Sequence, residues 1–126
     1  HSFHFFLMST QKIKICLNKT TGLGTLECVG GSTYNCGGDI NFKYPEDTTI
    51  QPSDKKGTVY SGEFVDSNNN PFEMKFSILW IGQRGVYIHE MGQLEGSHGC
   101  IHLLPGDAES VYNWVQRKTR ILFKWE

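Results

Sequence analysis

The chain has 126 residues, which is enough for one domain and too few for two. Aromatic residues make up 13% of the chain and hydrophobic residues 38%, which argues against intrinsic disorder because these side chains can build a core. The 12 Lys and Arg residues are balanced by 13 Asp and Glu residues, so no nucleic-acid partner is expected. The longest apolar run, residues 5–8, is too short for a membrane span.

The first residues differ in composition from the rest of the chain. We interpret residues 1–7 as a leader derived from cloning or from an upstream segment, and residues 8–126 as a single domain. The apolar run at residues 5–8 has no cationic start and is short for the core of a signal peptide, so no export signal is expected.

Hydrophobic periodicity predicts a mostly β domain with one short helix. Apolar and polar residues alternate in several segments, as they do in half-buried strands. The predicted strands are residues 12–18, 23–29, 57–65, 72–80, 86–90 and 121–125. Residues 30–56 are rich in turn-forming residues and are expected to form a long loop, with one short strand around residues 40–44. A helix is expected after Pro105-Gly106-Asp107, with Asp107 as its N-cap.

For two of the predicted strands, the alternation predicts which side chains share a face of the sheet. In residues 72–80 the apolar side chains are expected to share one face, with Ser77 on the other. In residues 86–90 the two apolar side chains are expected to point into the core. That arrangement places Tyr87 and His89 together on the opposite face of the same strand.

Potential nucleophilic chemistry is concentrated in one short segment. Three of the five histidines, His89, His98 and His102, lie within fourteen residues that also contain Cys100. A thiol is a poor nucleophile until it loses its proton, and a neighbouring imidazole can accept that proton or stabilise the thiolate. We therefore expect a Cys–His nucleophilic site, with the pKa of Cys100 lowered below that of a free thiol.

Glycines flank the central dipeptide of this segment. Gly96 and Gly99 bracket Ser97-His98, so the backbone can bend tightly and a substrate can approach the chain closely. Backbone N–H groups at such a turn can form an oxyanion hole.

Two other readings of the same residues stay open at this point. His98 and His102 can be surface loop residues and Cys100 a buried thiol, which would make the segment structural. Alternatively, His89, His98, Cys100 and His102 supply four ligands for zinc, although three of them lie only two residues apart, closer than in most zinc loops.

The four cysteines fit neither a disulfide-rich scaffold nor a paired-CxxC zinc module. If one is a working thiol, at most one disulfide can form among the other three. We expect these three to be small buried or half-buried residues: Cys16, Cys28 and Cys36.

The sequence around the cysteine resembles a known signature. Ser97-His98-Gly99-Cys100-Ile101 is similar to the motif of the L,D-transpeptidase (YkuD-like) catalytic domain, in which a strand His precedes a linker and then Ser/Thr-His-Gly-Cys. Here Ile88-His89 supplies the strand His, and the seven residues 90–96 supply the linker. The predicted elements from residue 12 to residue 125 follow the family's order.

Three features depart from the family pattern. His102 stands where the family usually has Arg or Asn, which puts the polar substrate contacts at that position in doubt. Asp54-Lys55-Lys56-Gly57 replaces the family's Thr-Pro-x-Gly run. The linker is shorter than in many housekeeping members and is similar to that of compact, toxin-like members injected into rival bacteria by a type VI secretion system.

The resemblance implies a β-sandwich with a short helix after the catalytic loop, and no metal or cofactor. The implied substrates are peptidoglycan stem peptides, cut between the L-centre of the third residue and D-Ala. Cys100 would be the nucleophile and His89 the base, oriented through its second ring nitrogen. The N–H groups of Gly99 and Cys100 would bind the oxyanion, and Ser97 and His98 would shape the loop.

Further expectations concern substrate contacts and biological context. Tyr87 and His102 are candidate substrate-binding residues. The acceptor in the second step is open among water, a D-amino acid and a second stem peptide. An antibacterial effector would act in the periplasm or cell envelope and would be paired with a cognate immunity protein. A housekeeping cross-linking enzyme and a catalytically silent wall-binding module are the alternatives, the latter disfavoured because His89 and Cys100 are both present.

Overall fold

The computed structural model describes residues 9–126, so the expected leader at residues 1–7 lies outside the described residues. The described residues form nine strands, one α-helix and two 3-10 turns. They are β1 (Gln11–Leu17), β2 (Leu23–Cys28), β3 (Thr33–Gly37), β4 (Asp47–Ile50), the 3-10 turn η1 (Pro52–Asp54), β5 (Lys55–Val65), β6 (Pro71–Ile81), the 3-10 turn η2 (Gly82–Arg84), β7 (Val86–Glu90), β8 (Ile101–Leu103), α2 (Asp107–Trp114) and β9 (Thr119–Trp125). The predicted mostly β fold with a short helix is confirmed.

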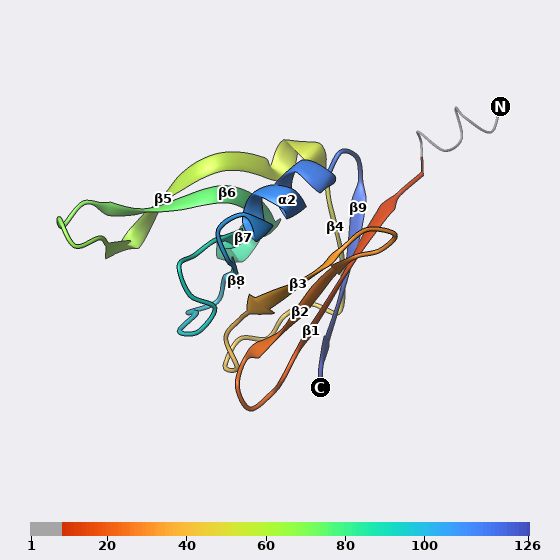
Figure 1. The fold of residues 1–126 in the computed structure, drawn as a ribbon, viewed down its shortest axis with the longest axis horizontal. Helices are drawn as coiled ribbons and strands as arrows, with labels where there is room; N and C mark the ends of the chain where they lie inside the picture. The colour runs from red at the N-terminus through yellow and green to blue at the C-terminus, as the bar shows by residue number, and fades with distance from the viewer. Residues whose placement is uncertain (1–8) are drawn as a thin grey trace.

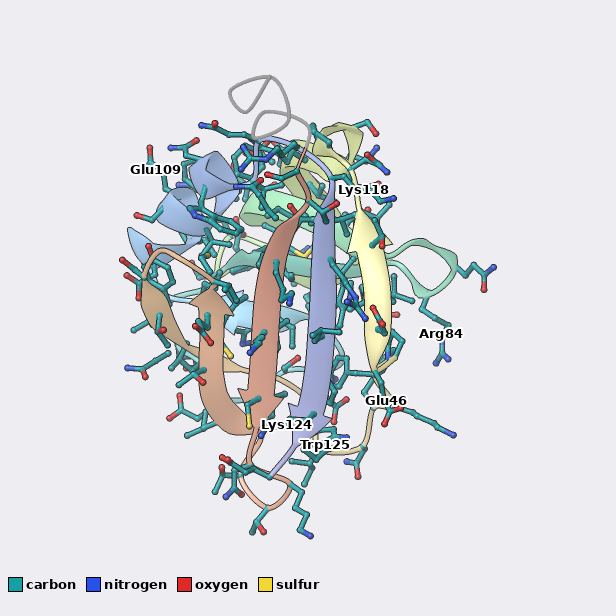
Figure 2. All side chains as sticks on the ribbon, turned by 90° about the vertical axis from the view of Figure 1, so that its right-hand side faces the viewer. Glu46, Arg84, Glu109, Lys118, Lys124 and Trp125 are labelled. Carbon is teal, nitrogen blue, oxygen red and sulfur yellow. The ribbon has the colours of Figure 1, made fainter. Side chains whose placement is uncertain are left out.

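The strands of the described chain form one continuous hydrogen-bonded sheet in the order β4-β9-β1-β2-β3-β8-β7-β6-β5. Two neighbouring pairs are parallel, β1 with β9 and β7 with β8, and the other pairs are antiparallel. Figure 2 shows β1, β9 and β4 side by side, with Trp125 at the end of β9. The sheet is therefore assembled from strands far apart in sequence.

The sheet curls so that strands distant in its order meet across the core (Figure 1). Trp80 of β6 donates its indole N–H to the Thr48 hydroxyl of β4 at 2.7 Å. The same indole lies 6.1 Å from the Phe123 ring of β9, measured between ring centroids. The two halves of the curled sheet thus enclose one apolar core.

The alternation read from the sequence explains much of this core. The buried side chains of β1, Ile13, Ile15 and Leu17, are those that the pattern directed inward, and Ile78 and Ile88 are buried on the facing half. Burying an aliphatic side chain of this size stabilises a fold by about 1.5–3 kcal/mol.

The predicted alternation fails in the middle of β6. Phe76 has φ 52°, and the register between β5 and β6 shifts beside it. This irregularity turns Ser77 into the core, contrary to its predicted outward orientation, and the Ser77 hydroxyl donates to the Met74 carbonyl at 2.8 Å. A bulge of this kind re-aims side chains within a strand.

The region at residues 30–56 also differs from its prediction. The expected strand around residues 40–44 is absent from the described chain, and strands occur instead at β3 and β4. Tyr44 is nevertheless buried, because its hydroxyl is hydrogen-bonded and its ring packs in the core, although it belongs to no strand. The three-residue strand β8 was not predicted either.

Helix α2 packs against β6 and β7 (Figure 1). Its N-cap is Gly106, at φ 90°, and Asp107 is the first helical residue, so the predicted Asp107 cap is wrong. The N-cap makes no side-chain hydrogen bond to this helix, because glycine has no side chain. No helix in residues 9–126 has the length and apolar character needed to cross a membrane.

Candidate active site

Two parallel strands bring the predicted site residues together. His89 of β7 is the register partner of His102 of β8, and their ring centroids are 5.4 Å apart. Cys100 directly precedes β8, at the end of the loop that returns from β7. The pairing of β7 with β8 therefore sets the strand His beside the end of the Cys loop.

The Cys100 thiol accepts a hydrogen bond from the Tyr87 backbone N–H, with a nitrogen–sulfur distance of 3.4 Å. Burial raises the pKa of the Cys100 thiol; the Tyr87 N–H opposes this effect, and the negative charge of Glu63 adds to it. The expected lowering of this pKa is thus wrong, because burial outweighs the stabilising hydrogen bond.

His89 is oriented by the backbone of its own strand. Its Nδ1 lies 2.7 Å from the Glu90 carbonyl oxygen. Because a carbonyl can only accept, Nδ1 carries the proton, which leaves Nε2 as a proton acceptor. Burial lowers the pKa of His89 to about 4, with a smaller opposing effect from this hydrogen bond. The imidazole is therefore neutral near pH 7 and able to accept a proton.

His102 is held in a similar way. Its Nδ1 lies 3.1 Å from the Leu94 carbonyl oxygen, within the loop between β7 and β8. The side chain is buried, and burial is the main cause of a lowered pKa for His102. His102 thus ties the linker to β8 and presents a second neutral ring beside His89.

The loop before the cysteine is closed by Ser97. The Ser97 hydroxyl donates to the Cys100 carbonyl and accepts a hydrogen bond from the Gly99 N–H at 3.0 Å. Gly99 has φ 139°, a conformation that favours glycine. The expectation that the Gly99 N–H is available to a ligand is not met in this structure, because that N–H is bonded to Ser97.

A cavity of about 870 Å³ opens above the cysteine. It is lined by all but one of the predicted site residues: Tyr87, His89, His98, Gly99, Cys100 and His102. Ser97 lies outside this lining and instead braces the loop. The predicted grouping of Tyr87 with His89 is consistent with their shared place on the cavity wall.

The opposite wall comes from a hairpin that the sequence did not connect with the site. Residues 59–65, together with Phe72 and Met74 of β6, line the cavity. This β5–β6 hairpin extends beyond the body of the sheet (Figure 1). The Phe64 ring packs edge-on against His98, with ring centroids 5.1 Å apart, although 47% of Phe64 is exposed. The hairpin therefore offers an apolar surface over the loop that carries His98 and Cys100.

Charged residues also border the cavity. Glu63 lines it from the hairpin, and Arg84 lines it from η2. The Arg84 guanidinium lies over the Phe42 ring, 5.1 Å from its centroid. In Figure 2 the Arg84 side chain projects from its turn to one side of β4. The cavity mouth thus combines an acidic and a basic side chain.

The cysteines outside the cavity differ from Cys100 in burial and reactivity. All four cysteines are free, and Cys28 and Cys36 are fully buried. Burial raises the pKa of each of these two thiols to about 12, so both are unreactive near neutral pH. Within residues 9–126 no three His, Cys, Asp or Glu side chains are arranged to hold a metal ion.

Comparisons with known proteins give a consistent assignment. Residues 22–122 match the family model of the L,D-transpeptidase catalytic domain, YkuD. An L,D-transpeptidase from Mycobacterium smegmatis has 20% sequence identity and a TM-score of 0.63 over 90% of this chain and 59% of its own. L,D-transpeptidase 1 of Mycobacterium tuberculosis has 19% identity and a TM-score of 0.64 over 93% of this chain and 62% of its own.

A third similar structure is L,D-transpeptidase 3 from Mycobacterium tuberculosis, in complex with a faropenem-derived adduct. It has 18% identity and a TM-score of 0.58, over 90% of this chain and 60% of its own. The chain therefore spans 59–62% of the length of these three solved relatives. A search of curated protein sequences gives no match.

The structural likeness confirms the fold, and the family model covers most of the chain from the first hairpin to the last strand. The chain belongs to the L,D-transpeptidase (YkuD) catalytic domain family.

Proposed function

We propose that this domain is a cysteine acyltransferase that acts on peptidoglycan stem tetrapeptides, at the bond between the L-centre of the third residue and D-Ala. The observation that carries this proposal is the geometry around the thiol. Cys100 and a neutral His89 line one cavity, and His89 is oriented through Nδ1 so that Nε2 can accept a proton. Nucleophilic acyl transfer by a cysteine depends on a base that can accept the thiol proton.

In the first step, His89 Nε2 takes the thiol proton while the Cys100 sulfur adds to the substrate carbonyl carbon. A carbon–sulfur bond forms, and the carbonyl oxygen becomes an oxyanion. We assign the Cys100 N–H as its donor, because the Gly99 N–H is bonded to Ser97. The intermediate then collapses: the carbon–nitrogen bond breaks, His89 returns the proton to the leaving amine, and D-Ala departs from a Cys100 thioester.

In the second step, an acceptor attacks the thioester carbonyl and gives its proton to His89. The carbon–sulfur bond breaks, and the thiolate recovers the proton from His89. Water as acceptor gives L,D-carboxypeptidase action, and an amine gives exchange or a cross-link. His89 thus acts as base and then as acid in each half of the reaction.

The resting pair is a thiol beside a neutral imidazole. Burial raises the pKa of Cys100 and lowers the pKa of His89, and both shifts disfavour a thiolate–imidazolium ion pair. Proton transfer is therefore coupled to substrate attack. Negative charge then develops on the substrate carbonyl oxygen, for which the Cys100 N–H is the proposed donor.

The short linker at residues 90–96 favours a small acceptor. Cross-linking needs a second stem peptide beside the acylated cysteine, and a seven-residue linker offers little protein to bind it. Release of D-Ala to water, or exchange with a D-amino acid, is accordingly the proposed outcome. A housekeeping 3-3 cross-linking role is the alternative within the same chemistry.

The short linker also supports a role as an antibacterial effector. Trimming donor stems would weaken the wall of a growing cell, as an antibacterial effector of a type VI secretion system requires. Such an effector would act in the periplasm or cell envelope and would be held in check by an immunity protein. A catalytically silent wall-binding module would have no need of a buried, oriented His89 that lines the same cavity as Cys100.

Incubation with purified tetrapeptide muropeptides tests this proposal. Tripeptides or exchanged tetrapeptides are expected as the main products in the digest, together with free D-Ala. Dimers linked between third residues as the main product would refute the linker argument and support the cross-linking role. Unchanged muropeptides that nevertheless bind the protein would support the silent wall-binding module.

A further inference from the structure

Tyr44 makes a buried contact with the catalytic loop that the sequence did not predict. Its hydroxyl donates to the Gly99 carbonyl oxygen at 2.7 Å, although 55 residues separate the two in sequence. The same hydroxyl accepts a hydrogen bond from the Asp39 backbone N–H at 2.9 Å. Because the Asp39 N–H can only donate, it directs the hydroxyl proton of Tyr44 toward Gly99.

The ring of Tyr44 is fixed by its neighbours. It stacks on Trp80 with 5.3 Å between ring centroids and 5° between the ring planes. The Phe42 and Phe123 rings lie at 4.7 and 4.8 Å from it on the same measure. Only 4% of Tyr44 is exposed, so its hydroxyl has little freedom to leave the Gly99 carbonyl.

The Gly99 carbonyl and the Cys100 N–H belong to the same peptide unit. This unit is planar, and in the trans form its C=O and N–H bonds point in opposite directions. A hydrogen bond that anchors the oxygen toward the buried Tyr44 therefore turns the nitrogen away from it. Gly99 and Cys100 line the cavity above the thiol, whereas Tyr44 lies outside that lining. The Cys100 N–H is thus directed away from the tyrosine core.

Anchoring is needed at this position because the loop is intrinsically free to rotate. Gly99 has φ 139°, which the lack of a side chain permits, and a glycine here can adopt many other backbone conformations. A Cβ at Gly99 would lie 3.5 Å from the Phe42 ring, so the aromatic cluster also packs closely against the loop. Ring packing alone does not fix the orientation of the Gly99–Cys100 peptide, whereas the hydrogen bond from the Tyr44 hydroxyl is directional.

We propose that Tyr44 is a positioning residue of the reaction: its hydroxyl holds the Gly99–Cys100 peptide so that the Cys100 N–H is preoriented to bind the oxyanion. This role rests on the proposed function, because an oxyanion forms only if Cys100 is acylated. Tyr44 acts through the Gly99 carbonyl, on the core side of the loop, so the role requires no contact between Tyr44 and substrate. Preorganised donors of this kind contribute to catalysis because they need no reorientation in the transition state.

The test compares two reactions of the same thiol. Acylation by faropenem passes through an oxyanion, whereas alkylation by iodoacetamide displaces iodide and forms none. Tyr44→Phe removes the anchoring hydroxyl and keeps the ring. We expect acylation to slow by about 10- to 100-fold, less than the roughly 100- to 1,000-fold loss caused by deleting an oxyanion donor outright. Alkylation of Cys100 should change by less than about twofold.

Tyr112→Phe is the matched control. The Tyr112 hydroxyl accepts a backbone hydrogen bond from Gly57 at 3.0 Å, so its loss removes a similar contact elsewhere in the fold. Acylation and alkylation should both remain near parental rates in this variant. If Tyr44→Phe does not fold, 4-fluorophenylalanine at position 44 fills the space of the hydroxyl without donating a proton, and the same split is expected.

The outcomes separate the inference from the proposed function. Parental acylation by a folded Tyr44→Phe protein would overturn the positioning role, as would an equal fall in acylation and alkylation, which indicates a merely structural effect. Rescue of acylation by 4-aminophenylalanine at position 44, which restores a donor, would support it. If the unmodified protein is alkylated at Cys100 but is acylated by neither faropenem nor tetrapeptide, the proposed function itself fails.

Discussion

The backbone N–H of Tyr87 donates a hydrogen bond to the Cys100 thiol at 3.4 Å, so the strand that carries His89 also holds the thiol. One element thereby fixes both members of the proposed catalytic pair. Parallel pairing of β7 with β8 then adds His102 beside His89. This short strand therefore positions the thiol and the proposed base, and the contacts of Ser97 and Tyr44 position the loop that carries Gly99.

Replacing the base should remove most of the activity without unfolding the protein. His89→Gln keeps a donor for the Glu90 carbonyl but lacks a ring nitrogen that can accept the thiol proton. Acylation by tetrapeptide should fall on the order of a thousandfold, as for other nucleophile–base pairs. Release of D-Ala measured under single-turnover conditions gives the rate. A fall smaller than tenfold would contradict the assignment of His89 as the base.

The thiol should be a slow nucleophile in the absence of substrate. Because burial raises the pKa of Cys100 above its ordinary 9.0, little thiolate is present near pH 7. We expect iodoacetamide to alkylate Cys100 more slowly at pH 7 than it alkylates a free cysteine, with a rate that still increases above pH 9. Peptide mapping distinguishes Cys100 from the partly exposed Cys16. A rate that levels off below pH 8 would show a lowered pKa instead.

The stability of the fold should depend on pH through His89. Its pKa is about 4 in the folded protein, against 6.5 for an unperturbed histidine. Between these values the unfolded chain binds more protons than the folded chain, so stability is full above pH 6.5 and falls as the pH drops toward 4. The loss attributable to His89 is at most about 3 kcal/mol.

Urea unfolding at several pH values measures this effect. His89→Gln should have a smaller fall in stability between pH 6.5 and 4, and the remainder should come partly from His102, whose pKa is also lowered by burial. Equal pH dependence in the parent and in His89→Gln would mean that His89 is not held neutral by burial.

The hairpin over the site should contribute to substrate binding. Phe64 lines the cavity and packs on His98, but about half of it is exposed, so little stability depends on it. Phe64→Ala should raise KM several-fold with little change in kcat or in melting temperature. Val29→Ala, at an exposed apolar residue outside the cavity lining, is the control and should leave both constants unchanged. A lower kcat with unchanged KM would place Phe64 in the chemistry instead of in binding.

Local patterns were enough to predict the elements that carry the base. Strict alternation located β7 and the inward side chains of β1, and the Ser97–Ile101 motif located the thiol. These features are encoded by residues close together in sequence. The bulge at Phe76 is not, because it arises from the register that β6 adopts against β5.

The other missed features arise from contacts between distant segments. β4 has a single buried residue, Ile50, so it has no apolar pattern to identify it. Tyr44 is buried through its contacts with Gly99 and the aromatic cluster, so its apolar character reflects tertiary packing and not strand pairing. Phe64 belongs to a hairpin whose position over the loop is set by the curl of the sheet. None of these has a signature in its own neighbourhood of the sequence.

Intact-mass measurement of the acyl-enzyme shows whether Cys100 is the nucleophile that takes up the donor peptide. The protein is mixed with a tetrapeptide muropeptide and quenched in acid. Mass spectrometry of the intact protein gives the mass of the adduct, and peptide mapping then identifies the modified residue. We expect an adduct equal in mass to the donor minus D-Ala, attached at Cys100. A folded Cys100→Ala variant should form no adduct and release no D-Ala. Release of D-Ala by Cys100→Ala at the parental rate, or an adduct on another residue, would contradict this role of Cys100.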